Sequence, residues 1–438
     1  MRSEARVRLV SLLGLVALLA AACGETTVEE EEVADDPEPE EVVEDDEPED
    51  EPEDEEAEPE EEAAAADGEP VVMGIINQED TPAGSFPEQR EAIEAAVEYV
   101  NDEFGGVEGR PIELVTEITD GSPESSSGAA TTLLEQDPLL IMPGTDFGTA
   151  ASLPIFEDAG VPYVGGVPLL PPELTSEISF SFVGGNVAAF PGQARYLAEE
   201  LEADHVSIIY TDNPAGLAAA ETFSQGPLES LGVSEVSLIP EEAAAADFTP
   251  AVSAANDGDP DAIMVLFAAQ GCSRIMQAAA SLGVDTPLVY PGSCMDIDVL
   301  EAGGEGAEGA YFNSEHIVYS DTDDEDVALY REIMEEYRPD AKVSSYSQSA
   351  FASVMNVYEI MAEIGADELT SESLIEALRQ TEDRESFMTD NYTCDGEQVP
   401  GAPSVCNASV RIVQIQDGEP VDLFDEWFDG SDLIEAEG

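Results

Sequence analysis

A regular alternation of apolar and amphipathic segments, which begins at residue 71, constrains the fold of this chain most strongly. Residues 71–76 form an apolar run of strand length. In residues 88–104 the apolar side chains recur every three or four positions, and Gly105 and Gly106 end the pattern, which is typical of a helix and its stop. Repeated units of this kind predict an α/β fold, in which parallel sheets carry right-handed crossover helices on both faces.

The alternation divides into two series, so we expect two similar lobes. The expected strands lie at 71–76, 112–118, 139–142 and 162–165 in the first series, and at 206–210, 236–239, 262–267 and 288–290 in the second. The expected helices lie at 88–104, 129–134, 150–158, 192–202, 215–230 and 273–282, with another after residue 247, and later at 324–337, 346–364 and 371–380. A last strand is expected at 409–415. Ligands of such folds bind beyond the carboxyl ends of the strands, so the cleft between the lobes is the expected site.

The charge of the chain narrows the range of its partners. It has 99 Asp and Glu residues against 13 Lys and Arg, a formal net charge of −86, and Lys342 is its only lysine. Nucleic acids and anionic membrane surfaces would repel such a chain, so we expect neither as a partner. Self-repulsion of this size is tolerable where salt screens it, which suggests a salty habitat.

The N-terminus has the pattern of an export signal. Three arginines precede an apolar run at 9–22, which ends at Cys23. A charged start, a short apolar core and small residues before the cut predict a secretory signal peptide over 1–22. Because a Cys follows directly, the segment resembles a bacterial lipobox, which implies that Cys23 is lipidated and anchors the protein to the extracytoplasmic face of the cell envelope. Ordinary secretion, with Cys23 lost or incidental, is the alternative. The apolar run is too short to span a bilayer comfortably.

Residues 23–70 are predicted to form a disordered acidic tether. The part at 28–70 holds 26 acidic residues and no basic residue. Like charges repel and Pro blocks helix formation, so this segment is expected to be extended. Binding of divalent cations by its carboxylates is the other interpretation. Residues 428–438 are predicted to be an acidic tail.

The cysteines agree with an exported protein. After Cys23 an even four remain: Cys272, Cys294, Cys394 and Cys406. Three pairings are possible, and we favour Cys272 with Cys294 and Cys394 with Cys406, because this pairing closes short loops within local units. The spacing of Cys and His does not support a zinc site, so no metal is predicted.

No motif for catalysis or for a cofactor passes its context test. Residues 304–309 have the GxGxxG pattern, but they precede an expected strand, whereas a dinucleotide-binding segment follows one. The GxSxG and HExxH motifs are absent. His205 and His316 are expected to be structural, and carboxylate pairs are too frequent here to indicate a glycosidase. We therefore predict no catalytic residue, no enzyme activity and no cofactor.

Four further segments carry a resemblance to a known family. They read EAAVEYVNDEFGGVEGR at 94–110, FEDAGVP at 156–162, LGVDTP at 282–287 and GGEGAEGAY at 303–311. In this order, over about 71–425, the chain resembles the leucine/isoleucine/valine-type periplasmic binding proteins, the substrate-binding subunits of ABC importers. The resemblance implies the type I fold of that group, with two Rossmann-like lobes of parallel sheets joined by three crossovers. Lobe 1 would comprise 71–188 plus 316–390, and lobe 2 would comprise 189–315 plus 391–427.

The resemblance also implies which residues of the first lobe face a ligand. In the family this lobe holds an amino-acid carboxylate through Ser or Thr and backbone N–H groups after the third and fourth strands. The matching residues here are Thr145, Asp146, Phe147, Gly148, Val167 and Leu169. Asp146 lies near the position at which the family has a Ser, and Leu169 lies at the position of its Thr. A ligand carboxylate would therefore be repelled by Asp146 and would lack the hydroxyl donor of the Thr. A helix cap at Asp146 and a simple turn at Thr145 and Gly148 are the structural alternatives.

The second lobe of the family supplies Tyr side chains and a Glu that grips the α-ammonium group. The matching residues here are Ala215, Gln270, Gly292 and Ser293, which include neither a Tyr nor an acid. Phe86 lies about where an aromatic side chain covers the ligand. Packing of Phe86 and a cap or solvated turn at Gln270 are the structural alternatives. These residues fit a branched-chain amino acid as well as a less polar, amide-like or cationic ligand paired with Asp146.

Together these features predict a monomeric solute-binding lipoprotein that delivers a small molecule to the permease subunits of an ABC importer by hinge closure. A ligand-sensing receptor subunit of the same fold that acts on a signalling partner is the alternative, and an extracellular hydrolase is a third. A Cys272–Cys294 disulfide would brace two loops on the second-lobe side of the cleft.

Overall fold

The computed structural model describes residues 68–81 and 84–434. The predicted signal peptide, Cys23 and nearly all of the predicted tether lie outside the described residues, as do the last four residues of the predicted tail. The chain divides into two units, Met1–Pro59 and Glu60–Gly438, and every described residue belongs to the second. No helix of this described part is long and apolar enough to cross a membrane.

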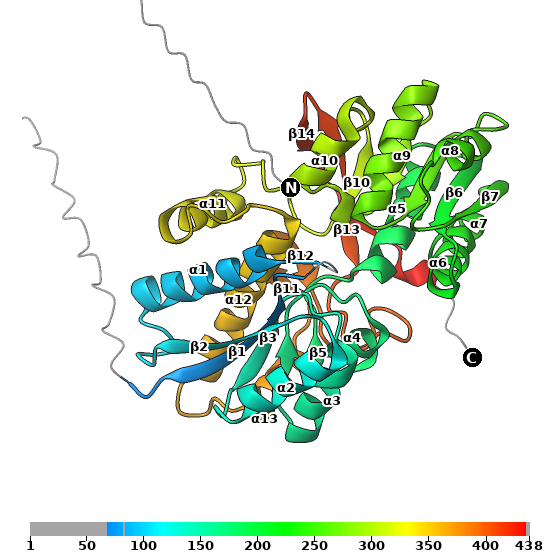
Figure 1. Ribbon diagram of the computed structural model, residues 1–438. Coiled ribbons are helices and arrows are strands. Elements are labelled where there is room, and N and C mark those ends of the chain that lie inside the picture. Colours follow the sequence, from blue (N-terminus) through cyan, green and yellow to red (C-terminus); the bar gives the residue numbers. More distant parts are fainter. Residues whose placement is uncertain (1–67, 82–83, 435–438) are drawn as a thin grey trace, which may run out of the picture. The chain divides into compact units, whose positions relative to one another are not determined.

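Five parallel strands form the first sheet (Figure 1). Their spatial order is β2 (Ile112–Thr119), β1 (Val71–Gln78), β3 (Leu140–Pro143), β4 (Tyr163–Val164) and β5 (Ser179–Phe180). Along the chain, each of the strands β1 to β4 is followed by a helix. These helices are α1 (Pro87–Phe104), α2 (Pro123–Leu134), α3 (Thr149–Ala159) and α4 (Pro171–Thr175). On β1, Met73 and Ile75 belong to one core with α1, whereas Ile76 belongs to another with α2 and α3. Burial on both faces explains why this strand is a continuous apolar run.

Three helices from late in the sequence pack on the α1 side of the first sheet (Figure 1). They are α11 (Glu325–Tyr337), α12 (Ser345–Ile364) and α13 (Ser371–Arg379). Each contributes a buried residue to the core that contains Met73: Val327, Phe351 and Leu374. A hairpin of β11 (Arg384–Ser386) and β12 (Thr389–Tyr392) follows them. The first sheet, its four helices, these three helices and the hairpin are called the first lobe.

The second sheet, with its helices, forms the second lobe. Its strands are, in spatial order, β14 (Glu419–Asp422), β13 (Ser409–Gln416), β10 (Tyr311–Ser314), β9 (Leu288–Tyr290), β8 (Ala262–Leu266), β6 (His205–Thr211) and β7 (Glu235–Glu241), with β15 (Phe428–Asp429) paired to β13. Strands β6 to β10 pair in parallel, as predicted. In contrast, β13 pairs antiparallel with β10, β14 and β15, which adds a mixed edge that the sequence analysis did not predict. The helices are α5 (Asn186–Glu199), α6 (Pro214–Ala220), α7 (Gly226–Ser230), α8 (Thr249–Ala255), α9 (Ala269–Leu282) and α10 (Ile297–Gly303).

Every strand and helix expected from the sequence is present, but the helix expected at 215–230 is interrupted. Between α6 and α7 the segment Glu221–Gln225 is a π-helix, and the N–H group of Gly226 donates to the carbonyl of Glu221, five residues earlier. Pro227 comes next and has no N–H group, so a regular α-helical hydrogen bond is impossible at that residue. The proline therefore explains why the helix departs from α geometry here.

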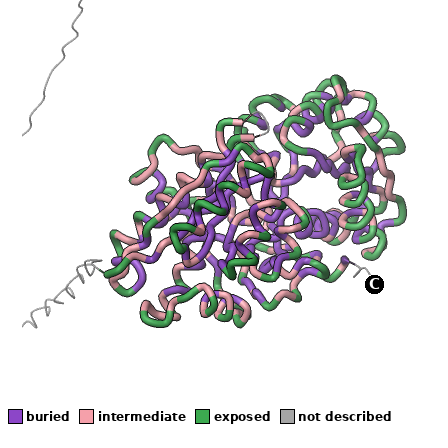
Figure 2. Tube along the Cα trace, turned by 60° about the horizontal axis from the view of Figure 1, so that its bottom comes forward, coloured by how far each residue is buried: buried purple, intermediate pink, exposed green. Residues whose placement is uncertain are grey.

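The chain crosses between the lobes three times. The crossovers lie between β5 and α5, between β10 and α11, and between β12 and β13. The first and the third are hydrogen-bonded to each other, because Ser181 N donates to Ser404 O (2.8 Å) and Cys406 N donates to Ser181 O (2.9 Å). Figure 2 shows that buried residues run through the interior of the described part, whereas exposed residues lie on its outer turns.

Both predicted disulfides are present. Cys272–Cys294 joins α9 to the turn after β9, and Cys394–Cys406 closes a loop within the third crossover. All four cysteines are buried. The first disulfide therefore braces two segments that follow neighbouring strands of the second sheet.

Removal of the first disulfide should lower the stability of the protein. The variant Cys272→Ala/Cys294→Ala loses a cross-link between residues 22 positions apart. Chain entropy then predicts a free energy of unfolding lower by about 3 kcal/mol, and a melting midpoint lower by about 4 °C. Calorimetry without reductant measures this shift, and a midpoint equal to that of the wild type would contradict a stabilising role for the disulfide.

Candidate functional site

A cavity of about 440 Å³ lies at the carboxyl ends of the strands of both sheets. The first lobe lines it with Phe147 after β3, with Val167, Leu169 and Leu170 after β4, and with Ser345 and Tyr346 at the start of α12. The second lobe contributes residues of α5 and of the segments after β6, β8, β9 and β10. The first two crossovers add Gly185, Glu315 and His316. Small-molecule sites commonly have this volume.

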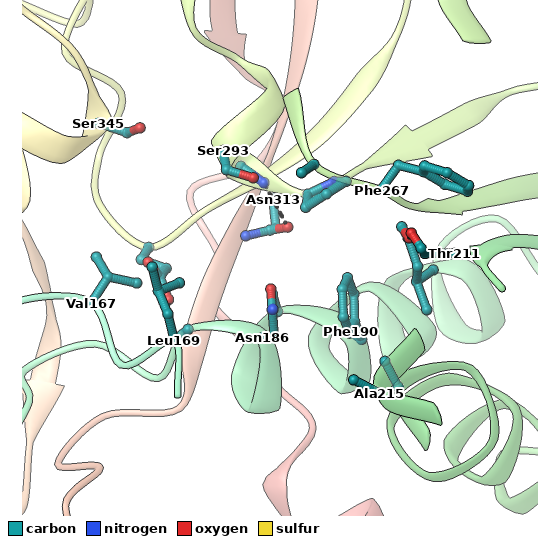
Figure 3. A pocket seen from close by; sticks show the side chains of 18 of the residues that line it. Val167, Leu169, Asn186, Phe190, Thr211, Ala215, Phe267, Ser293, Asn313 and Ser345 are labelled. Carbon is teal, nitrogen blue, oxygen red and sulfur yellow. Dashed lines mark hydrogen bonds between the residues drawn. The ribbon is translucent and has the colours of Figure 1, made fainter. Parts of the chain in front are cut away.

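One end of the cavity is lined mainly by apolar side chains, beside Thr211, whose hydroxyl donates to Leu266 O (3.4 Å). Phe190 on α5 and Phe267 after β8 are buried and lie at this end together with Ala215 (Figure 3). The ring of Phe267 makes an edge-to-face contact with the buried ring of Phe248, with 5.3 Å between the ring centroids. Such contacts restrict an aromatic side chain, so this end is a preformed surface for the hydrocarbon part of a ligand.

Asn313, at the end of β10, provides a hydrogen-bond donor to the cavity. Its Oδ1 accepts from Gln193 Nε2 (2.8 Å) and from Gly292 N (3.1 Å), and the second of these donors is a backbone N–H group. The amide oxygen is thereby assigned, and Figure 3 shows the side chain directed into the cavity. No acceptor within the described ranges is hydrogen-bonded to its Nδ2. The amide nitrogen of Asn313 is therefore available to a ligand.

Gly292 has no room for a side chain. A Cβ atom at this position would lie 2.6 Å from the backbone oxygen of Asn313, which cannot move away without disturbing β10. Gly292 occupies the position at which the second lobe of the resembled family has the Glu that grips the α-ammonium group. With this packing, an acid at position 292 is excluded, so a ligand nitrogen would have to find its partner elsewhere.

Glu315 lies on the second crossover and is the acid that lines the cavity. Its Oε1 accepts from the N–H group of Gly185, the residue that precedes α5, at 2.5 Å. Burial raises the pKa of Glu315 to about 7, and the hydrogen bond from Gly185 offsets only part of this effect. No Lys, Arg or His within the described residues forms an ion pair with it. The cavity therefore contains a carboxyl group that titrates near neutral pH and has no cationic partner.

The neighbouring titratable groups do not supply a charge. Burial lowers the pKa of His316 to about 3, so its ring is neutral, and burial raises the pKa of Tyr346 to about 12. The Tyr346 ring packs on Phe86 with 5.7 Å between centroids, and Phe86 contacts Phe147 at 6.1 Å. Phe86 therefore supports two rings of the cavity wall without lining the cavity itself.

Backbone donors of the loop after β3 are hydrogen-bonded within the first lobe. Thr145 N donates to Gln89 Oε1 (2.6 Å), and Phe147 N donates to Gln78 Oε1 (3.1 Å). Both glutamines are buried, so these bonds are shielded from water. These two N–H groups are thus not free to hold a ligand carboxylate.

Asp146 is buried and connects three parts of the first lobe. Its Oδ1 accepts from Thr119 Oγ1 at 2.9 Å, from Ser126 Oγ at 2.9 Å and from Gly148 N at 3.1 Å. These partners belong to β2, α2 and the residue before α3. The carboxylate is therefore directed into the lobe, and Asp146 does not line the cavity.

The loop after β4 is held in the same way. Glu173 Oε2 accepts from the N–H groups of Leu169 (2.9 Å) and Leu170 (2.8 Å), the two leucines that line the cavity. Burial raises the pKa of Glu173, and these two hydrogen bonds act in the opposite direction. Both first-lobe loops thus direct backbone donors to side chains of the chain itself.

The structure brings together six of the eleven ligand contacts proposed from the sequence. Those that line the cavity are Phe147, Val167, Leu169, Ala215, Gly292 and Ser293. The others lie outside the cavity wall: Phe86, Thr145, Asp146, Gly148 and Gln270. Gln270 is exposed on the first turn of α9. Within the described residues, no group of three or more His, Cys, Asp or Glu side chains is placed to bind a metal ion.

Sequence analysis missed the residues that give the cavity its chemical character. These are Phe190, Phe267, Asn313, Glu315 and Tyr346. Phe190 and Phe267 look like core residues in the sequence, because an aromatic side chain near the end of a strand or helix is usually buried. Glu315 was hidden by the excess of acids, since one Glu among 99 acidic residues carries no signal. Its position directly after the strand 311–314 was the one available indication.

A family model described as "Periplasmic binding protein" matches residues 70–419 of the chain. No protein with a curated description matches the sequence. The match to the family model covers both lobes and all three crossovers.

Solved structures of the same fold cover most of this chain. An ABC transporter substrate-binding protein from Sphaerobacter thermophilus has a TM-score of 0.70 at 18% identity, covering 84% of this chain and 100% of its own. A fatty acid ABC transporter substrate-binding protein from Thermomonospora curvata has a TM-score of 0.67 at 19% identity, covering 85% and 95%. A branched-chain amino acid transporter substrate-binding protein from Streptococcus pneumoniae, in complex with isoleucine, has a TM-score of 0.64 at 18% identity, covering 81% and 100%. At these identities the likeness shows the fold.

Replacement of Asp146 should affect stability. In Asp146→Ala three buried donors lose their shared acceptor, so we expect the free energy of unfolding to fall by about 3 kcal/mol and the melting midpoint to fall by about 4 °C. The control is Asp158→Ala, which removes an exposed acid on α3 and should change the free energy by less than about 0.5 kcal/mol. Equal midpoints for the two variants would show that Asp146 does not hold the lobe together.

Proposed function

Because the chain belongs to the periplasmic binding protein family, we propose that it is the solute-binding subunit of an ABC importer. A small molecule enters the cavity, the two lobes close on it about the crossovers, and a permease in the membrane recognises the closed form. The observation that carries this proposal is the cavity of about 440 Å³, whose wall comes from both lobes and from two crossovers. A ligand that touches both lobes favours closure by its higher affinity for the closed form.

The ligand that we propose is a small amino-acid-like or amide molecule. Its apolar part would lie against Phe190 and Phe267, and its polar part would lie near Asn313 and Ser293. The free amide nitrogen of Asn313 supports an acceptor on the ligand at this place. Proteins of the same fold are described with ligands as different as isoleucine and fatty acids, so the fold does not select the ligand and the cavity wall must do so.

We further propose that the protein is exported, anchored through a lipid on Cys23 and monomeric, with 23–70 as its tether. The charged start, the apolar run and the Cys that follows small residues support this location. The two disulfides agree with it, because disulfides persist in oxidising compartments outside the cytoplasm.

A ligand screen by thermal shift tests the proposed function. The exported chain with Cys23→Ser, in high salt, should melt at a higher temperature with at least one solute among amino acids, short amides and amines. Binding to the native state alone stabilises it by about 2.7 kcal/mol at a hundredfold excess over the Kd. The same ligand should lower the radius of gyration in small-angle scattering. Silence across the panel together with an unchanged radius of gyration would contradict the proposal.

Removal of either cavity phenylalanine should weaken binding of whichever solute is found. We expect Phe190→Ala and Phe267→Ala to raise its Kd at least tenfold, because both residues line the cavity and each variant removes an aromatic ring from its wall. The control is Phe104→Ala, which removes a ring that is 46% exposed and lies away from the cavity. Titration calorimetry measures the three values of Kd. If all three variants bind equally well, the ligand lies elsewhere.

A further inference from the structure

Glu315 stands apart from the other acids of this strongly acidic chain. It lines the cavity, it keeps part of its surface accessible, and one of its two oxygens is hydrogen-bonded to Gly185 N. No donor in the described part of the chain is hydrogen-bonded to the other oxygen, Oε2. A carboxylate at a largely dehydrated wall is stabilised only by a positive charge or by further donors.

The cavity wall itself does not supply that positive charge. It contains no Lys or Arg among the described residues, and His316 is neutral because burial lowers its pKa to about 3. The chain's only lysine, Lys342, is engaged with Asp296 and Asp298, with an Nζ–Oδ2 distance of 2.9 Å to Asp298. No cationic side chain of the described residues is thus placed to pair with Glu315, and a ligand that carries a positive charge would provide one.

The two first-lobe loops of the same wall lack the usual arrangement for a ligand carboxylate. The N–H groups of Thr145 and Phe147 are bonded to glutamines, and those of Leu169 and Leu170 are bonded to Glu173. One of the helix ends at the cavity, the start of α5, already carries the carboxylate of Glu315, next to which an anion would otherwise be favoured. A carboxylate on the ligand at that place would be repelled by Glu315.

We infer that Glu315 is the specificity-determining residue of the cavity and binds the protonated nitrogen of a small organic cation with an apolar body. The nitrogen lies at Oε2, and the hydrocarbon part extends to Phe190 and Phe267. The inference rests on the proposed solute-binding function. It departs from the amino-acid-like or amide ligand named there, because it assigns the ligand to the amines without a free carboxylate. The net charge of −86 supports it, because a negative field concentrates cations around the protein.

Binding should depend on pH through Glu315. Burial raises its pKa to about 7, so its ionised fraction increases about tenfold between pH 6 and pH 8. A cation prefers the ionised form, hence affinity rises with pH. The other titratable groups here keep their charge over this range: His316 stays neutral, and Tyr346, whose pKa is raised to about 12, also stays neutral. Besides Glu315, the acids whose charge raises the pKa of Tyr346 are Glu88 and Asp296.

Four probes with one hydrocarbon body separate the classes of ligand. They are leucine (a zwitterion), 3-methylbutan-1-amine (a cation), 4-methylpentanoate (an anion) and 4-methylpentanamide (neutral). Titration calorimetry on the exported chain with Cys23→Ser should give the lowest Kd for the amine. That Kd should be about tenfold higher at pH 6 than at pH 8. A lower Kd for leucine or for the anion would overturn the inference.

Two matched variants assign the effect to Glu315. Glu315→Gln keeps the shape and the hydrogen bond from Gly185, and it should raise the Kd of the amine at pH 8 at least thirtyfold and abolish its pH dependence. Glu305→Gln makes the same change at an exposed acid of the same lobe and should leave the Kd unchanged. An amine Kd that is equal in both variants would overturn the inference.

A measurement without ligand keeps the test independent of the choice of probe. The uncompensated charge of Glu315 should destabilise the wild type as pH rises from 6 to 8, so the melting midpoint of Glu315→Gln should exceed that of the wild type by more at pH 8 than at pH 6. Equal differences at the two pH values would overturn the inference. Binding of the amide or leucine that does not depend on Glu315 would refute this inference and leave the proposed function standing, whereas silence in the broader screen would refute both.

Discussion

Parallel strand pairing is the constraint on which the rest of the structure depends. Because β1 pairs in parallel with β2 and β3, and β6 with β7 and β8, each sheet directs the segments that follow its strands to one edge. These segments, the start of α12 and the crossovers enclose the cavity. The antiparallel strand β13 is added next to β10, on the side of the second sheet opposite to β7. It therefore does not disturb the carboxyl ends of the parallel strands.

A few buried acids have a local role that their number in the sequence obscures. Asp146, Glu173 and Glu315 each accept hydrogen bonds from backbone N–H groups of a loop or helix end around the cavity. Glu173 and Glu315 occupy donors of residues that line the cavity, which a ligand carboxylate would otherwise use, whereas Asp146 holds Gly148 outside the cavity wall. The many exposed acids are different, because solvent and salt reduce their repulsion.

Different parts of the fold were predictable to different degrees. Strand β1 was evident because burial on both faces produces an unbroken apolar run, and α1 because one face is apolar and glycines end it. Strand β5 has two residues and was missed, whereas β4, which is as short, was predicted within the apolar segment 162–165. The antiparallel hairpin of β13 and β14 was missed because strand direction depends on the path of the chain and not on local sequence.

The sequence by itself determined the α/β class and the two lobes, because apolar periodicity is a local property of the chain. It favoured one of three cysteine pairings, and the structure contains that one. Only the tertiary structure decided that Asp146 turns into the first lobe while Glu315 reaches the cavity. Both acids follow a strand, and their directions depend on donors brought close by folding: Asp146 meets Ser126, and Glu315 meets Gly185, which is 130 positions away. Contacts between segments so far apart in sequence leave no local pattern, and they determine the chemistry of the cavity.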